Sequence, residues 1–136
     1  MIKSDAQRER TAAQIDGFQQ ALAKVASEKS DKRSAAIRGS YESMIRLLEG
    51  ELREYDQLKA GEVALPRVER LDQIAPFITR IRIAKGLSQT ELARRLGVSK
   101  QVISRYEESD YQTLSLTRLQ NILDAIGIRA DVTLSA

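Results

Sequence analysis

The chain has 136 residues, of which 42% are hydrophobic and only 4% aromatic, so it has room for one domain or two small ones with a core dominated by aliphatic side chains. It contains no cysteine and no histidine, which excludes disulfides, zinc fingers and histidine-based proton or metal chemistry. The formal net charge is +3, and the excess comes entirely from residues 66–136, because residues 1–65 hold equal numbers of acidic and basic side chains.

The remaining chemistry of the chain also argues against catalysis. Its acidic residues lie in mixed-charge runs such as 49–56, which are typical of solvated helix surfaces. We therefore expect no enzyme, no metal site and no cofactor. The first residues lack the apolar stretch of a signal peptide, and no apolar run is long enough to span a membrane. We expect a cytoplasmic protein without a membrane partner.

Residues 1–61 have the pattern of two helices in a hairpin. Ser4 and Gln7 form a capping box at the start of the first helix, the polar segment 27–34 has the composition of a turn, and Gly61 follows the second helix. Each helix carries an apolar stripe at spacings of 3 and 4 residues. The first stripe comprises Ile15, Phe18, Leu22 and Val25, and the second comprises Ile37, Tyr41, Met44, Leu48, Leu52 and Tyr55.

The hairpin admits three roles. Two stripes that face each other can satisfy both helices without a partner. Two isolated helices bury little surface, however, and such hairpins gain stability from a second copy or from a neighbouring domain. The sequence therefore leaves open a self-contained core, a dimer contact, and a binding site for a toxin or another protein.

A linker and a second domain follow the hairpin. Residues 62–71 mix Pro66 with alternating apolar and polar residues, which is typical of a linker. We place the second domain at residues 72–128, with Pro76 in the first turn of a helix, where its missing amide hydrogen has no partner in any case.

Residues 86–107 predict two short helices joined by a tight turn. Ser88 and Glu91 form a capping box for the first helix, and Gly97 ends it in a left-handed conformation that is unstrained without a Cβ. Ala93 lets the second helix cross the first at short range. The apolar frame comprises Leu92, Leu96, Val98, Ile103 and Tyr106.

The polar face of the second short helix predicts what it can bind. Four side chains that can hydrogen-bond share this face, opposite the inward face that carries Ile103. They are Lys100, Gln101, Ser104 and Arg105. Glutamine suits the adenine edge in the major groove of DNA, and lysine or arginine suits the guanine edge. Plain solvent exposure is the alternative, but seven basic side chains against the single acidic Glu91 over residues 80–105 favour binding to phosphate.

Residues 72–128 resemble the lambda-repressor-like, or Xre-type, helix-turn-helix domains of phage repressors and bacterial antitoxins, most specifically over residues 86–107. The resemblance implies five short helices, of which the second and third correspond to Gln89–Leu96 and Lys100–Glu107. It implies that Lys100, Gln101 and Arg105 meet base edges, with Ser104 on the same face. The phosphate contacts that we expect are Ser88, Gln89 and Arg94.

The resemblance also implies residues that support the motif. An arginine of the first helix in this family pairs with the glutamate that closes the third, so we expect an ion pair between Arg82 and Glu107. The structural residues of the motif are then Arg82, Ala93, Gly97, Ile103 and Glu107.

The end of the chain predicts a loop, a helix and a strand. Residues 108–114 form the loop, Ser115 caps a last helix, and Gly127 ends it. Residues 129–136 alternate apolar and polar side chains, which is typical of a short half-buried β-strand. This tail resembles the terminal strand with which HipB-like antitoxins pair across a two-fold axis. A frayed terminus is the alternative.

The expected fold is therefore all-α, with an N-terminal helical hairpin at residues 1–61, a five-helix DNA-binding domain and a short C-terminal β-strand. We expect a sequence-specific transcriptional repressor that binds double-stranded DNA as a homodimer on an inverted repeat. An antitoxin that represses its own promoter and binds a toxin protein is the natural extension. The alternative is a protein-interaction adaptor that uses the hairpin and binds little or no specific DNA.

Overall fold

The computed structural model describes residues 1–27 and 31–136 and divides the chain into two compact units, Met1–Gln57 and Leu58–Ala136. Within the described residues, the regular structure of both units is helical throughout. The all-α class that we expected is present.

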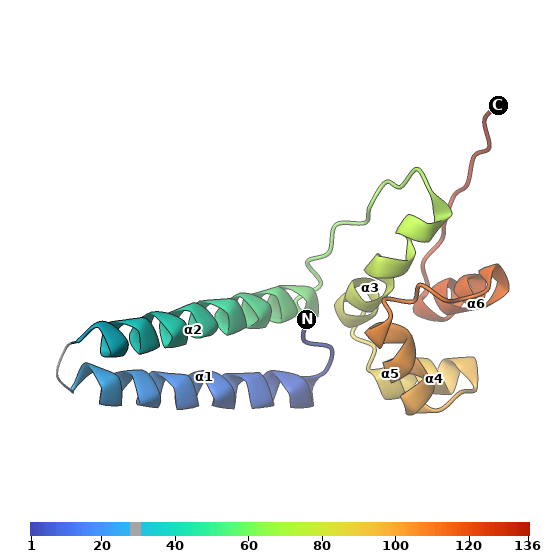
Figure 1. Ribbon diagram of the computed structural model, residues 1–136. Coiled ribbons are helices and arrows are strands. Elements are labelled where there is room, and N and C mark those ends of the chain that lie inside the picture. Colours follow the sequence, from blue (N-terminus) through green and yellow to red (C-terminus); the bar gives the residue numbers. More distant parts are fainter. Residues whose placement is uncertain (28–30) are drawn as a thin grey trace. The chain divides into compact units, whose positions relative to one another are not determined.

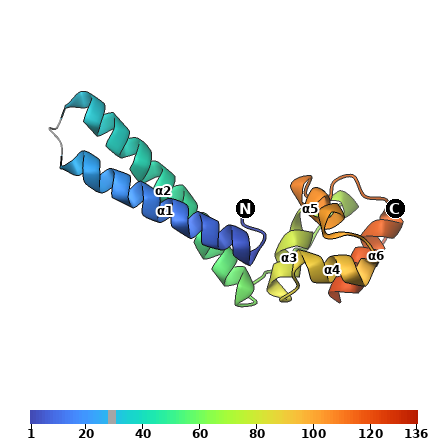
Figure 2. The same cartoon turned by 90° about the horizontal axis from the view of Figure 1, so that it is seen from below.

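The first unit contains two antiparallel helices, α1 (Asp5–Ala26) and the long helix α2 (Lys32–Lys59), whose last turn passes the unit boundary. The two helices run side by side in both views (Figures 1 and 2). The Ser4 side chain accepts a hydrogen bond from the Gln7 amide at 3.2 Å, so α1 begins at the predicted cap. Of the predicted turn at 27–34, residues 28–30 lie outside the described residues.

The hairpin core forms where the two apolar stripes meet. Ile15 and Tyr55 are buried as expected, and the rings of Phe18 and Tyr41 lie 5.8 Å apart. The stripe predicted on α2 is wrong at Ile37 and Met44, which are 37% and 41% exposed; beside Met44, the neighbouring Ile45 takes the buried position. One residue turns a helix by about 100°, so a small error in the direction of a stripe exchanges adjacent side chains.

After the end of α2, the second unit continues with residues 61–70, which form no helix, and then with two single-turn 3₁₀ segments and four short α-helices. The predicted five-helix domain therefore has four α-helices, and Pro76 lies in the second 3₁₀ turn. The bounds are η1 (Leu71–Gln73), η2 (Ala75–Phe77), α3 (Ile78–Ala84), α4 (Gln89–Leu96), α5 (Lys100–Glu108) and α6 (Leu116–Ile126).

A single hydrophobic cluster joins the helices of the second unit. Leu92 of α4, Ile103 of α5 and Ile122 of α6 are fully buried in it, and Ile78 of α3 completes the set of aliphatic side chains without exposed surface. Serine caps begin α4, α5 and α6, and glycines end α4 and α6 in the left-handed conformation. These predicted boundaries are confirmed.

The predicted C-terminal β-strand is wrong. Residues 128–136 carry no regular secondary structure, and Val132 and Leu134 of the tail are exposed. The alternating pattern is present, but a strand exists only as part of a hydrogen-bonded ladder. Within the described residues, no other segment is extended in a ladder to which the tail could add.

The turn between α4 and α5 generates a stability prediction. Gly97 has φ 67°, and no atom lies within 4 Å of a Cβ built on it, so Gly97→Ala introduces backbone strain without a steric clash. We expect a loss of about 1 kcal/mol in the free energy of unfolding. Chemical denaturation followed by circular dichroism measures the change.

Gly17→Ala is the matched control for this substitution. Gly17 lies inside α1, and a Cβ there also meets nothing within 4 Å. Because the backbone at Gly17 is helical, alanine should raise the stability of the hairpin by up to about 1 kcal/mol. Equal effects of the two substitutions would contradict the strain argument.

Candidate nucleic-acid interface

Helix α4 is fixed at both ends by local hydrogen bonds. The Ser88 hydroxyl accepts from the Glu91 amide at 3.0 Å, and Gly97 closes the helix with its amide directed at the Arg94 and Ala93 carbonyls. The Glu91 carboxylate does not complete the predicted capping box but pairs with Arg94 at 2.6 Å and with Arg95 at 3.3 Å. These arginines, Arg94 first, lower the pKa of Glu91.

Helix α5 presents two contrasting faces. The Ser99 hydroxyl accepts from the Val102 amide at 3.4 Å and fixes the start of the helix, and Ile103 anchors the inward face in the core. Of the four side chains predicted to read DNA, Lys100, Gln101 and Arg105 are exposed and Ser104 is half-buried. The structure therefore brings the predicted reading face together on the first turns of one helix.

A buried ion pair joins α5 to α3. Arg82 is 2% exposed and Glu107 is completely buried. The Arg82 Nε and Nη2 atoms donate to the two carboxylate oxygens of Glu107 at 2.5 and 3.0 Å, which is the bidentate geometry that makes an arginine–carboxylate pair strong. Arg82 Nη1 donates to the Leu87 carbonyl at 2.6 Å, so the turn before α4 is held by the same side chain.

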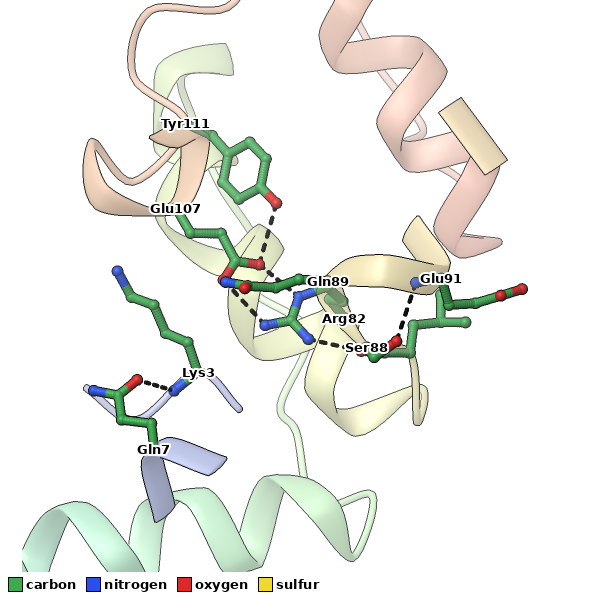
Figure 3. Close-up of polar contacts among 9 residues, drawn as sticks. Lys3, Gln7, Arg82, Ser88, Gln89, Glu91, Glu107 and Tyr111 are labelled. Atoms are coloured by element: carbon green, nitrogen blue, oxygen red, sulfur yellow. Dashed lines mark hydrogen bonds and ion pairs between the residues drawn. The ribbon is translucent and has the colours of Figure 1, made fainter. Parts of the chain in front are cut away.

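Two further donors bind the Glu107 carboxylate (Figure 3). The Gln89 side-chain amide donates to Oε2 at 2.8 Å, and the Tyr111 hydroxyl donates to Oε1 at 3.3 Å. We call Arg82, Gln89, Glu107 and Tyr111 the Glu107 cluster. It connects α3, the first residue of α4, the end of α5 and the loop after α5.

Tyr111 reaches the Glu107 cluster from a strained backbone. Its φ is 57°, a left-handed conformation that disfavours residues with a Cβ by about 1–2 kcal/mol. The side chain is almost completely buried and packs near Tyr106, with ring centroids 5.9 Å apart. Burial, followed by the negative charge of Glu107, raises the pKa of the Tyr111 hydroxyl, so this group stays protonated and acts as a donor.

The side chains predicted to contact phosphate have different surroundings. Ser88 and Arg94 are exposed, the former as the cap of α4 and the latter in its ion pair with Glu91. Gln89 is half-buried because its amide binds Glu107. A glutamine amide has two N–H donors, and the bond to Glu107 uses one of them. The phosphate roles of these three residues stay predictions.

The basic side chains counted over residues 80–105 differ in burial and in pairing. Arg82 is buried against Glu107, and Arg94 and Arg95 share Glu91. Lys85, Lys100 and Arg105 have exposed side chains. Arg94 and Arg95 are exposed as well, but Glu91 offsets one of their two charges, so the positive charge at the surface is smaller than the sequence count suggests.

Three contacts of this region were not predicted from the sequence. Tyr111 was expected only as part of the loop at residues 108–114, although an aromatic residue four positions after Glu107 is a usable signal. The second role of Gln89 was not expected either. Nor was that of Arg95, whose Nη1 donates to the Ala125 carbonyl at 2.8 Å and ties α4 to the end of α6. Backbone carbonyl partners have no signature in a sequence.

Comparison with known families supports the resemblance. Residues 78–132 match the family model described as helix-turn-helix. The matched range covers α3 to α6 and the start of the tail. No curated protein and no solved structure matches the chain. Residues 78–132 are therefore similar to helix-turn-helix domains, a class that places one helix in the major groove of DNA. No helix among the described residues is both long and apolar enough to cross a membrane.

The Glu107 cluster generates a stability prediction. Arg82→Ala leaves a buried carboxylate without its main partner, and we expect a loss of about 3–5 kcal/mol in the free energy of unfolding of the second unit. Chemical denaturation measures it.

Arg70→Ala is the control, because it removes an ion pair with Asp72 in which both side chains are exposed. An exposed ion pair adds little to stability, so the control should lose far less than Arg82→Ala. The double variant Arg82→Met with Glu107→Leu should recover part of the loss, because it leaves no unpaired charge. A double variant less stable than Arg82→Ala would contradict this account.

Proposed function

We propose that the protein is a sequence-specific DNA-binding transcription regulator that reads base pairs with α5. The observation that carries the proposal is the exposure of Lys100, Gln101 and Arg105 on one face of α5, within a domain that matches the helix-turn-helix family. The major groove is about 12 Å wide and admits one α-helix. Arg105 and Lys100 suit guanine edges, and Gln101 suits an adenine edge.

Contacts to the DNA backbone would fix the register of α5. Residues at the start of α4 are suited to this task, because the amides of its first turn carry partial positive charge. The second N–H of the Gln89 amide is available to a phosphate in this arrangement while the first holds Glu107. Ser88 and Arg94 extend the same contact surface.

The regulator acts in this proposal as a homodimeric repressor on an inverted repeat. One α5 reaches only a few base pairs, and two copies related by a two-fold axis place their reading helices in successive major grooves, about 34 Å apart. Two half-sites multiply the discrimination against non-specific sites. An autoregulating antitoxin is the finer form of this proposal, and its support is the resemblance of residues 72–128 to domains of that kind.

Selection of bound sequences from a random pool of double-stranded DNA tests the proposal. We expect a recurring motif with inverted symmetry and a half-site spacing of about one helical turn. Affinity should fall steeply between about 50 and 200 mM salt, because phosphate contacts release counterions. No binding even at low salt would reject the proposal in favour of the protein-interaction adaptor. Co-purification of a small toxin encoded beside the gene would support the antitoxin role.

Substitutions on α5 and α4 should separate base reading from backbone contact. Arg105→Ala or Gln101→Ala should lose about 1–3 kcal/mol at the selected site and relax the base preference. Gln89→Ala should weaken binding to all sequences to a similar extent. Mobility-shift titrations with selected and random DNA measure both effects.

The control for Arg105 is Arg118→Ala, which removes one positive charge from α6. It should leave the base preference unchanged. Equal losses of Arg105→Ala on selected and random DNA would contradict the base-reading role of Arg105.

A further inference from the structure

Helix α2 carries a second apolar stripe that the hairpin core leaves exposed. Ile37 is 37% exposed, Met44 is 41% exposed and Leu47 is 59% exposed, and Ser40 between them is exposed as well. The spacings along Ile37, Ser40, Met44 and Leu47 are 3, 4 and 3 residues. This is the a and d pattern of a coiled-coil seam, here on the surface of the helix. We call these four residues the outer stripe.

Opposite charges continue the outer stripe at its two ends. Arg33 precedes Ile37 by four residues, and Glu51 follows Leu47 by four residues, so both extend the same helix face. Arg33 is exposed. Glu51 is half-buried, and its carboxylate lies 3.6 Å from the amino group of Met1 at the edge of the stripe.

These positions are complementary to themselves under a two-fold axis. If two α2 helices run antiparallel with the axis at the level of Glu42, Ile37 lies opposite Leu47 of the partner subunit. In the same register Ser40 lies opposite Met44 of the partner subunit, which pairs a small side chain with a large one. Arg33 then faces Glu51 of the partner subunit. An antiparallel coiled coil pairs a with d positions, and the register found here does so in every layer.

We propose that the outer stripe is a dimerisation surface on which α2 packs antiparallel against α2 of a second copy of this chain, in the register set by the axis at Glu42. Each two-fold interface forms every pairing twice, so the two ends carry matched Arg33–Glu51 ion pairs without an external partner. The stripe itself carries no charge that would need a charged partner.

Small residues at the edge of the outer stripe permit the close approach. Ser43 and Gly50 lie one heptad apart beside the stripe. A Cβ on Gly50 would meet only the end of the Arg53 side chain, at 3.9 Å. Among the described residues no close contact therefore requires a glycine at this position, although glycine inside a helix is unfavourable. Close packing of a second helix against this edge would account for a glycine at position 50.

Dimerisation through the outer stripe would add to the small apolar core of the hairpin. Two helices alone bury few side chains: the buried hydrophobic residues among the described part of this unit are Ile2, Ile15, Ile45 and Tyr55. Pairing of two hairpins gives a four-helix arrangement with a shared apolar core. All of these features belong to the hairpin. The proposal rests on the proposed function at one point only. The surface supplies the dimer that binding to an inverted repeat requires.

Sedimentation equilibrium of the full chain tests the surface. The wild-type chain should dimerise, and Leu47→Asp should raise the dimer dissociation constant at least about tenfold, because it buries an unpaired carboxylate in the interface. Ala13→Asp is the matched control, since Ala13 is an exposed apolar residue of α1 outside the outer stripe. It should leave the dissociation constant unchanged. Circular dichroism checks that both variants stay helical.

Charge reversal provides a second test that does not disturb the apolar core. Arg33→Glu should weaken the dimer because two glutamates then face each other, and the double variant Arg33→Glu with Glu51→Arg should restore it. Failure of the double variant to recover would overturn the proposed register.

Cross-linking tests the register directly, because the chain has no cysteine of its own. The double variant Ile37→Cys with Leu47→Cys should form a covalent dimer on mild oxidation. Each single variant should not, because equal positions lie about 15 Å apart along the helix axis in this register. Cross-linking of either single variant would overturn the antiparallel register.

The outcomes for dimerisation and for DNA binding remain separable. A monomeric wild-type chain, or a Leu47→Asp chain that dimerises as well as wild type, would overturn the proposed surface. Binding of a single half-site by a monomeric Leu47→Asp chain would support both the surface and DNA reading by α5. A wild-type chain that dimerises through the outer stripe but binds no DNA would support the surface and reject the proposed function.

Discussion

The buried carboxylate of Glu107 is the constraint on which the geometry of the second unit depends. A charged carboxylate in an apolar core is stable only when its oxygens are hydrogen-bonded, and here Arg82, Gln89 and Tyr111 supply the donors. Apolar packing has no preferred direction, whereas these bonds fix three neighbouring segments against the end of α5. The Glu107 cluster therefore sets the angle between the short helices more narrowly than their aliphatic contacts can.

Within its nine residues, helix α5 has one face that packs in the core and another face that is exposed. Ile103 and Glu107 lie one turn apart on the inward face, and the side chains of Lys100, Gln101 and Arg105 turn outward. Because Glu107 is held by side chains from outside α5, these three exposed residues need no contacts of their own to keep their direction. A reading face that is free of structural bonds can give all its donors to a ligand, which is the condition for base recognition.

The sequence predicts the local features of this molecule better than the long-range ones. The caps at Ser88 and Gly97 follow from chemistry within four residues, and the structure has both. The pair of Arg82 with Glu107 was expected only from the resemblance, since 25 residues separate them. Tyr111 escaped prediction because its role depends on a left-handed turn, and the C-terminal strand was wrong because alternation alone supplies no neighbouring strand.

The misassigned stripe of α2 has a physical reason that bears on assembly. Apolar side chains cover more of the circumference of α2 than one neighbouring helix can bury, so a count of apolar positions cannot separate the inner face from an outer one. Burial separates them: Ile45 packs inward, and Met44 and Leu47 do not. In a hairpin without a partner, polar residues would be favoured at the exposed positions of α2. An apolar seam flanked by charges of opposite sign is instead the pattern of a surface that meets its own copy.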